Sequence, residues 1–162
     1  MEKSLKIYIT FGIFYIVLVL FIVIPIHYYV AQPFLVDGEA MNPTYKNNDY
    51  LLVNRFDHEF NRGDVIVFET SNKGEYFIKR MFGMPGEKIE IKDGKIFIND
   101  NVFNDIYYNG KTGRDISINL NQNQYFVLGD NRDRSIDSRD FGAVDKKDIM
   151  GKILYKIPSL IK

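Results

Sequence analysis

The sequence predicts a mainly β fold, in which a single N-terminal transmembrane helix is followed by an all-β domain. Three observations predict this fold class. Residues 7–36 carry no formal charge and are mostly apolar. After them, short runs rich in Val, Ile, Phe and Tyr alternate with Gly, Asn and Asp, a pattern typical of strands and turns. No segment of this outer part repeats its apolar residues with the 3.6-residue period of a long amphipathic helix.

The first element is predicted to be a membrane anchor. Residues 7–26 have the sequence IYITFGIFYIVLVLFIVIPI, and twenty helical residues span about 30 Å, the thickness of a hydrocarbon core. We therefore expect a cytoplasmic N-terminus at 1–6, a transmembrane anchor at 7–30 and an extracytoplasmic β domain at 31–162. A cleavable signal peptide is the alternative, but Ala31 is the only alanine among the first 39 residues, so an Ala-x-Ala-like cleavage site is missing.

Charge predicts the orientation of the anchor and excludes one class of partner. Lys3 and Lys6 precede the apolar run, and the next charged residue is Asp37. Positive flanks stay on the cytoplasmic side, so the protein is expected in the plasma membrane with its main domain outside and the lipid bilayer as a partner. The chain has 21 basic and 21 acidic residues, interspersed, which argues against a nucleic-acid-binding surface.

Eight segments of the outer domain are predicted to be strands. They are Tyr50–Asn54, Asp64–Glu69, Tyr76–Phe82, Lys88–Lys92, Lys95–Asn99, Asp115–Leu120, Tyr125–Leu128 and Ile149–Ile157. Asp93-Gly94 separates two alternating runs and predicts a hairpin, and Met84–Glu87 predicts another turn. The polar stretch Asn104–Gly113 is expected to be a surface loop. Many short strands separated by turns rich in Gly, Asn and Asp indicate a barrel-like or folded sheet.

The residue types exclude several kinds of chemistry. The chain has no cysteine, so it can form neither a disulfide nor a thiol nucleophile. It has only two histidines, His27 and His58, far apart in the sequence, which argues against a Ser-His-Asp triad and a histidine-based metal site. No phosphate-binding loop and no metal-ligand cluster is apparent in the sequence, so we expect no cofactor and no metal.

Four sequence blocks in a fixed order carry the functional signal. They are GEAMNPT at 38–44, RGDVIVF at 62–68, YFIKR at 76–80 followed by GMPG at 83–86, and GDNR at 129–132 followed by Ser135, DSR at 137–139 and Gly142. Together with the anchor, these blocks resemble the type I signal peptidase family, the bacterial leader peptidases. The resemblance covers nearly the whole chain, and the fourth block alone is long and specific.

The resemblance implies a signal-peptidase-like catalytic domain and a definite activity. Family members are membrane-bound serine endopeptidases that remove N-terminal signal peptides from exported preproteins with a Ser/Lys dyad. By resemblance, Lys79 is the general base and Ser135 orients its amine. Gly38, the backbone near Ala40 and Met41 are the implied oxyanion and substrate-binding groups. The implied structural ions near the site are Arg80, Asp130, Asp137 and Arg139.

The surroundings of Lys79 suit the role of a base. A lysine accepts a proton only as the neutral amine, so its pKa must fall from about 10.4 toward the working pH. Burial without a counter-ion lowers the pKa, because desolvation penalises the charged form. Lys79 lies in an apolar run that includes Phe77 and Phe82, and strand alternation would place it opposite Ile78 and Arg80. Taken alone, a strand lysine would be interpreted as a solvated surface residue.

Ala40 departs from the family pattern, because it occupies the position of the nucleophilic serine. A methyl group cannot attack a peptide carbonyl. Three explanations stay open: a deliberate serine-to-alanine substitution, a natural homologue that binds signal peptides without cleaving them, and a natural enzyme with another nucleophile or an activated water. The retained Lys79 and Ser135 favour an engineered or recently lost serine. The activity of the chain itself is left open by the sequence.

The expected substrate is an extended peptide with small residues, Ala-x-Ala-like, before the cut. An extended chain can pair with a sheet edge while shallow pockets accept alternate side chains. The candidates for pocket walls, for membrane contact or equally for core positions are Phe34, Leu35, Val36 and Met41. Two rival functions are a membrane-anchored signal-peptide-binding protein and a purely structural anchored β domain. A Ser-Lys repressor protease would carry a DNA-binding module where this chain has a membrane helix.

Overall fold

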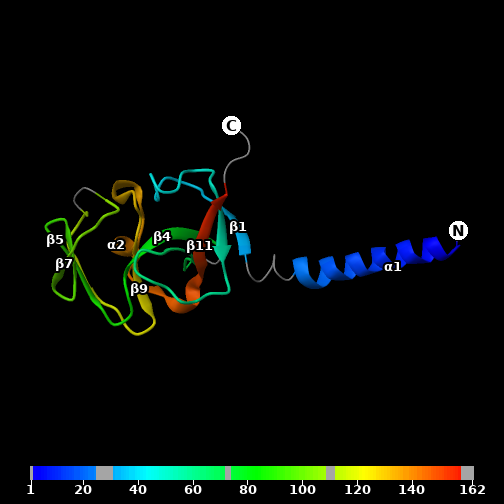
Figure 1. The fold of residues 1–162 in the computed structure, drawn as a ribbon. Coiled ribbons are helices and arrows are strands. Elements are labelled where there is room, and N and C mark those ends of the chain that lie inside the picture. Colours follow the sequence, from blue (N-terminus) through cyan, green and yellow to red (C-terminus); the bar gives the residue numbers. More distant parts are fainter. Residues whose placement is uncertain (1, 25–30, 72–73, 109–111, 158–162) are drawn as a thin grey trace.

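The computed structural model describes residues 2–24, 31–71, 74–108 and 112–157. Helix α1 (Glu2–Leu18) continues into one π-helical turn, η1 (Val19–Val23). Within these ranges, Leu5–Val23 is the one helical stretch long and apolar enough to cross a membrane, with a mean hydropathy of 2.4 and none of its span buried. Figure 1 shows this helix apart from the β domain. The predicted anchor at 7–30 overlaps this stretch, and its residues 25–30 lie outside the described ranges.

The β domain consists of two antiparallel sheets (Figure 1). The larger has the order β1-β2-β11-β3-β4-β9-β10 and the smaller the order β7-β6-β5-β8. The strands of the larger sheet are β1 (Ala31–Leu35), β2 (Tyr50–Asn54), β11 (Ile149–Ile157), β3 (Val65–Glu69), β4 (Tyr76–Gly83), β9 (Gln124–Leu128) and β10 (Val144–Asp145). Those of the smaller sheet are β7 (Asn101–Phe103), β6 (Lys95–Ile98), β5 (Lys88–Lys92) and β8 (Ile116–Asn119). The short helices are η3 (Arg132–Arg134), α2 (Ser138–Phe141) and η4 (Lys146–Asp148).

The mainly β prediction is confirmed, and each of the eight predicted segments contains a strand. Three strands were not predicted. β1 contains Pro33, which lacks a backbone N–H and is tolerated because β1 is the edge of its sheet. β7 and β10 are too short to show an alternating pattern. β7 follows a tight turn in which Asn99 and Asp100 both have positive φ, the geometry of a two-residue hairpin loop.

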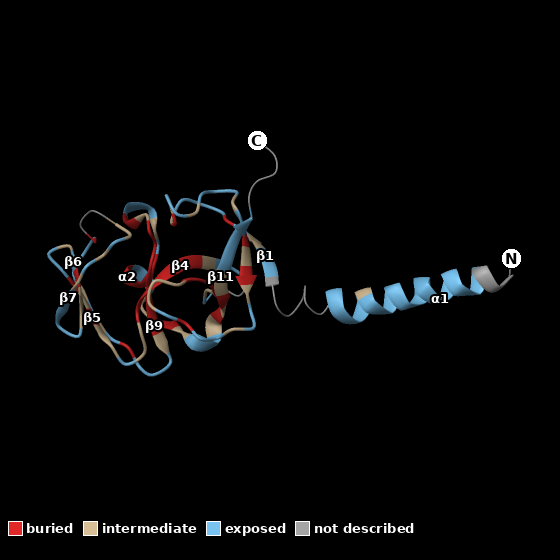
Figure 2. Cartoon of the chain, viewed as in Figure 1, coloured by how far each residue is buried: buried red, intermediate tan, exposed pale blue. Residues whose placement is uncertain are grey.

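Strand β4 is buried on both faces, and this positions the site. Ile78 packs with Val36 and Met41 on one face, whereas Met81 packs on the other with Phe77. Figure 2 shows the buried residues concentrated in β4, β9 and the strands beside them. Side chains alternate between the two faces of a strand, so Lys79 lies on the face of Phe77 and Met81. The predicted placement of Lys79 opposite Ile78 therefore agrees with the core packing.

Candidate functional site

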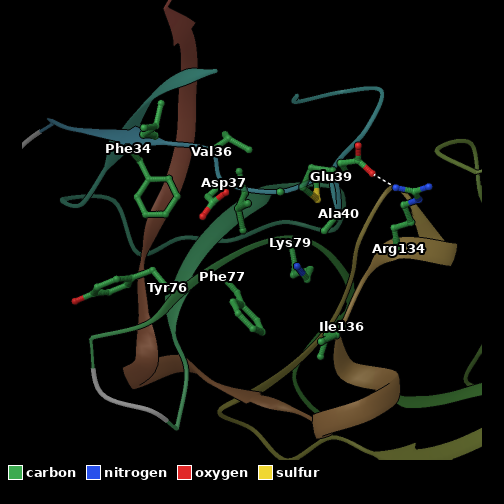
Figure 3. Close-up of a pocket in the computed structure, with 14 residues that line it drawn as sticks. Phe34, Val36, Asp37, Glu39, Ala40, Tyr76, Phe77, Lys79, Arg134 and Ile136 are labelled. Carbon is green, nitrogen blue, oxygen red and sulfur yellow. Dashed lines mark hydrogen bonds and ion pairs between the residues drawn. The ribbon is translucent and has the colours of Figure 1, made fainter. Parts of the chain in front are cut away.

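One cavity collects residues from two of the four sequence blocks, the first and the third, and from the loop that carries the fourth. It has a volume of about 240 Å³ and lies between β1 with the turn after it, β4, and the loop that follows β9. Figure 3 shows Ala40, Lys79, Phe77 and Ile136 around it. All four residues proposed from the sequence as pocket walls line this cavity: Phe34, Leu35, Val36 and Met41. Val36 and Met41 are also fully buried, so they serve as core and wall at once.

The turn that carries Ala40 is fixed by main-chain contacts to the fourth block. The backbone N–H of Asn131 donates to the carbonyl oxygen of Ala40 at 2.9 Å, and the side-chain amide of Asn131 donates to the carbonyl of Glu39 at 3.1 Å. Gly38 has a φ of 97°, in the left-handed region that glycine adopts readily. These contacts hold residue 40 in place without using its side chain.

The backbone donors near Ala40 differ in their availability. The N–H of Gly38 already donates to Oδ1 of Asn47 at 2.9 Å. The N–H of Ala40 donates to no acceptor within the described part of the chain. An oxyanion in this cavity would therefore find a free donor at Ala40, whereas the Gly38 amide would first have to leave Asn47. The expected contribution of Gly38 to an oxyanion pocket stays a prediction.

Lys79 is buried in the cavity wall with an exposed fraction of 4%. Burial lowers its pKa from 10.5 to about 8, and the negative charge of Asp137 acts in the opposite direction. The ammonium nitrogen lies 4.9 Å from the centre of the Phe77 ring. None of the acidic side chains that the structure describes lies close enough to Lys79 to form an ion pair. A buried amine without a direct counter-ion is the condition expected of a general base near neutral pH.

The structure places Ser135 close to this site but not in hydrogen-bond contact with Lys79. Its hydroxyl oxygen is buried and has no hydrogen-bond partner among the described residues. A Cβ atom on Gly129 would lie 2.2 Å from that hydroxyl oxygen and 2.6 Å from the carbonyl oxygen of Ala40. The missing side chain of Gly129 thus lets the Ser135 loop and the Ala40 turn approach each other. The implied role of Ser135 in orienting the amine stays a prediction.

Arg80 and Asp130 form a buried bidentate ion pair behind the cavity. Nε and Nη2 of Arg80 donate to the two carboxylate oxygens at 2.7 and 2.6 Å. Thr44 donates its hydroxyl to the same carboxylate at 2.5 Å. The guanidinium carbon also lies 3.9 Å from the centre of the Tyr107 ring. The pair and the Thr44 bond join β4, the loop that follows β9 and the turn after Ala40, as expected of a structural brace.

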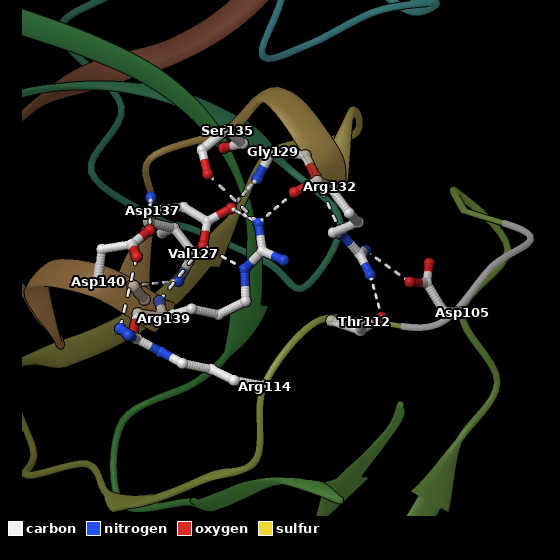
Figure 4. Close-up of polar contacts among 11 residues, drawn as sticks. Asp105, Thr112, Arg114, Val127, Gly129, Arg132, Ser135, Asp137, Arg139 and Asp140 are labelled. Atoms are coloured by element: carbon white, nitrogen blue, oxygen red, sulfur yellow. Dashed lines mark hydrogen bonds and ion pairs between the residues drawn. The ribbon is translucent and has the colours of Figure 1, made fainter. Parts of the chain in front are cut away.

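A second buried pair organises the loop that carries Ser135 (Figure 4). Nε of Arg139 donates to Oδ1 of Asp137 at 2.7 Å, and the other carboxylate oxygen accepts the N–H of Gly129 at 2.9 Å. Arg139 also donates to the carbonyl oxygen of Arg132 at 2.7 Å. Asp137 and Asp140 form a capping box at the start of α2, which satisfies the free N–H groups there. The loop is therefore held by several buried hydrogen bonds beside the cavity.

Sequence reasoning missed several residues that shape the site. Arg132 is buried and pairs with Asp105 at 2.5 Å, which ties this loop to the loop that follows β7. Glu39 and Arg134 form an ion pair at the cavity mouth (Figure 3). Neither pairing joins residues that are close in sequence, so only the fold reveals them. Thr44 was recognised as part of the first block, but nothing in the sequence predicted its hydrogen bond to Asp130.

Lys79 is expected to cost stability at neutral pH, because the folded state has the lower pKa and binds its proton less tightly than the unfolded state. The cost is full below pH 8 and disappears as the pH rises above the unfolded pKa of about 10.4. We expect Lys79→Met to raise the unfolding free energy by about 3 kcal/mol at pH 7 and by much less at pH 10.5. Urea unfolding of both chains in detergent measures this. An equal difference at both pH values would contradict a charge origin.

The chain is similar to bacterial signal peptidases. Residues 8–157 match the family described as "Signal peptidase, peptidase S26". Signal peptidase I P of Bacillus subtilis subsp. natto is 37% identical, over 93% of this chain and 89% of that protein. Signal peptidase IB of Staphylococcus aureus (strain Mu50) is 33% identical, over 79% of this chain and 78% of that protein. A crystal structure of a signal peptidase I from Enterococcus faecalis V583 has a TM-score of 0.53 and 31% identity, and the match covers 60% of this chain and 97% of that one.

Proposed function

Because the chain belongs to the signal peptidase family, peptidase S26, we propose that it binds the N-terminal signal peptides of exported proteins in the cavity between β1 and β4. The observation that carries this proposal is the buried Lys79, which lines the same cavity as Ala40. A buried lysine without a counter-ion lowers the stability of the fold, so its presence indicates a functional role, and a site that binds peptide carbonyls would use it as a base.

We place the position of the family's catalytic serine at Ala40. A serine hydroxyl there would donate its proton to the neutral Lys79 amine and attack the scissile carbonyl carbon. The free N–H of Ala40 would then donate to the developing oxyanion. With alanine at this position the first step lacks its nucleophile, so the chain as written is proposed to bind signal peptides without cutting them through this route.

The shape of the cavity favours an extended peptide with small residues. Its walls are the backbone and apolar side chains of two roughly facing segments, 34–41 and 76–79. Phe34, Ile78 and Ile136 make these walls apolar, and the small volume leaves little room for bulky side chains. We therefore propose Ala-x-Ala-like sequences as ligands, with the smallest side chains next to the Ala40 position.

The apolar helix supports a membrane location. We propose that Leu5–Val23 anchors the chain in the plasma membrane, with its N-terminus in the cytoplasm and the β domain outside. A site held close to the bilayer suits a substrate whose own apolar segment is still embedded.

The test compares the full chain and its Ala40→Ser variant in liposomes with a fluorogenic Ala-x-Ala signal peptide. We expect both to bind the peptide and only the variant to cleave it. Cleavage by the chain with Ala40 would overturn the assignment of the nucleophile position. If both chains are folded and bind but neither cleaves, the purely binding function gains support.

The pH dependence of the Ala40→Ser variant is expected to follow Lys79. Only the neutral amine can accept the serine proton, and burial holds the pKa of Lys79 at about 8. The rate kcat/KM should therefore rise with pH through about 8 and level off above it. Asp137→Asn removes a charge that raises this pKa, so the midpoint should move to lower pH. A profile that falls through pH 8 would contradict the base role.

A further inference from the structure

The cavity of the chain as written contains an unused nucleophile. Among its described lining residues, Lys79 is the only one with an amine, and Ala40 presents a methyl group where a hydroxyl would otherwise compete. Arg134, the other basic lining residue, pairs with Glu39 at the cavity mouth and is largely exposed. The amine is thus buried and without an ion-pair partner in the described part of the chain, beside a space that a small molecule can enter.

We propose that the ε-amine of Lys79 captures small apolar aldehydes as an imine in this cavity. The inference concerns the same cavity as the proposed function, but it requires neither a signal peptide nor a serine. It assigns the chain a reversible covalent ligand site, with a short-chain aldehyde as the ligand class.

The chemistry needs no further reactant. The neutral nitrogen attacks the carbonyl carbon, and one of its protons moves to the former carbonyl oxygen. The resulting hydroxyl leaves as water with the second nitrogen proton, and a carbon–nitrogen double bond remains. A lysine desolvated in an apolar pocket is a recognised nucleophile toward carbonyl compounds.

The surroundings of Lys79 favour this reaction over reaction at surface lysines. Burial keeps a useful fraction of the amine neutral near pH 7, since its pKa lies at about 8. The charged groups around it are Asp137 behind it and Asp37, Glu39 and Arg134 at the cavity rim. Of these, Asp137 is the one that raises the pKa of the amine, and it does not outweigh burial.

The walls and the size of the cavity define the ligand class. Phe77 and Ile136 line the cavity beside Lys79 (Figure 3), Ile78 lines it as well, and these walls offer apolar contact to an alkyl chain. The volume of about 240 Å³ is below the 300–1,000 Å³ typical of sites for drug-sized ligands. A short alkyl aldehyde therefore fits the cavity better than a sugar aldehyde or a bulky aromatic one.

The experiment traps the imine in the full-length chain in detergent. The chain is incubated at pH 7 with butanal and cyanoborohydride, which reduces the imine to a stable butylamine, and each lysine is followed by peptide mass spectrometry. The exposed Lys95 is the internal reference. At pH 7 the neutral fraction of Lys79 exceeds that of an ordinary lysine by about two orders of magnitude, and its lower basicity removes part of that gain. We expect Lys79 to react about tenfold faster than Lys95.

Matched variants separate the site from general labelling. Lys95→Met should leave the labelling of Lys79 unchanged, whereas Lys79→Met should remove the fast phase with no change at Lys95. Glyceraldehyde, a polar aldehyde of similar length, should lose the preference for Lys79. The proposal is overturned if, in a chain whose near-ultraviolet circular dichroism shows it to be folded, Lys79 reacts no faster than Lys95.

The outcome is independent of the cleavage assay. Fast labelling of Lys79 in the chain with Ala40, combined with no cleavage by folded Ala40→Ser, supports the imine site and counts against the peptidase assignment. Cleavage by Ala40→Ser without fast labelling of Lys79 in the original chain overturns the imine site alone.

Discussion

Replacing Ala40 with serine is expected to raise the rate of signal-peptide cleavage by on the order of 10⁶, because removing the nucleophile of a serine protease lowers its rate by about this factor. The reason is local. The turn is already held by Asn131, and Lys79 already lines the cavity, so only the hydroxyl is missing. Alanine and serine differ by one oxygen atom, and residue 40 is only half-buried, so the substitution should cost little stability. Single-turnover cleavage of a fluorogenic signal peptide in liposomes measures the gain.

Two controls give this prediction its specificity. Glu39→Ser places a hydroxyl one residue earlier, where the side chain points to Arg134 at the rim, and it should produce no cleavage. Adding Lys79→Met to Ala40→Ser should abolish the gain, while circular dichroism shows a folded chain. If the double variant cleaved as fast as Ala40→Ser, another base would have to be sought and the role of Lys79 would be wrong.

Breaking the buried pair of Arg80 and Asp130 is expected to lower the free energy of unfolding by about 3–5 kcal/mol, because the remaining charge stays buried without its partner. Asp130 is 1% exposed and also accepts the Thr44 hydroxyl, so Asp130→Ala removes the acceptor of three donor groups, two on Arg80 and one on Thr44. Urea unfolding of the full chain in detergent measures the loss. Asp133→Ala is the matched control, since this aspartate lies in the same loop but is exposed, and it should change stability by less than about 1 kcal/mol.

The same variant tests what the pair does for chemistry. In the Ala40→Ser background, Asp130→Ala should reduce cleavage through the loss of folded chain, so the activity per folded molecule at low temperature should fall far less than the total. A loss of activity in a fully folded chain of normal stability would contradict the structural role and indicate direct participation in the reaction.

The sequence predicted the fold wherever a periodic pattern was long enough to be recognised. The central strands β2, β5 and β11 begin and end where their apolar patterns do. β1 was not predicted because it contains Pro33, a residue that is unusual in strands. β10 was not predicted because two residues are too few to show an alternating apolar pattern.

The site was predictable in its components but not in its pairings. The burial of Lys79 followed from its apolar neighbours, and it is confirmed. The pair of Arg132 and Asp105 joins two loops that the tertiary fold brings together, so no local sequence pattern predicts this pair. The Ser135 hydroxyl, expected from the family resemblance to orient the Lys79 amine, has no hydrogen-bond partner among the described residues and lies against Gly129, so this role stays a prediction.

The main-chain attachment of the Ala40 turn has an evolutionary consequence. Because Asn131 holds the carbonyls of Glu39 and Ala40 through hydrogen bonds that ignore the side chain at position 40, selection can change that side chain without disturbing the turn. Alanine and serine codons can be interconverted by a single base change. Under the proposed function, a lineage with this chain could therefore silence and restore the peptidase repeatedly, each time by one mutation, for as long as Lys79 and its apolar surroundings are kept.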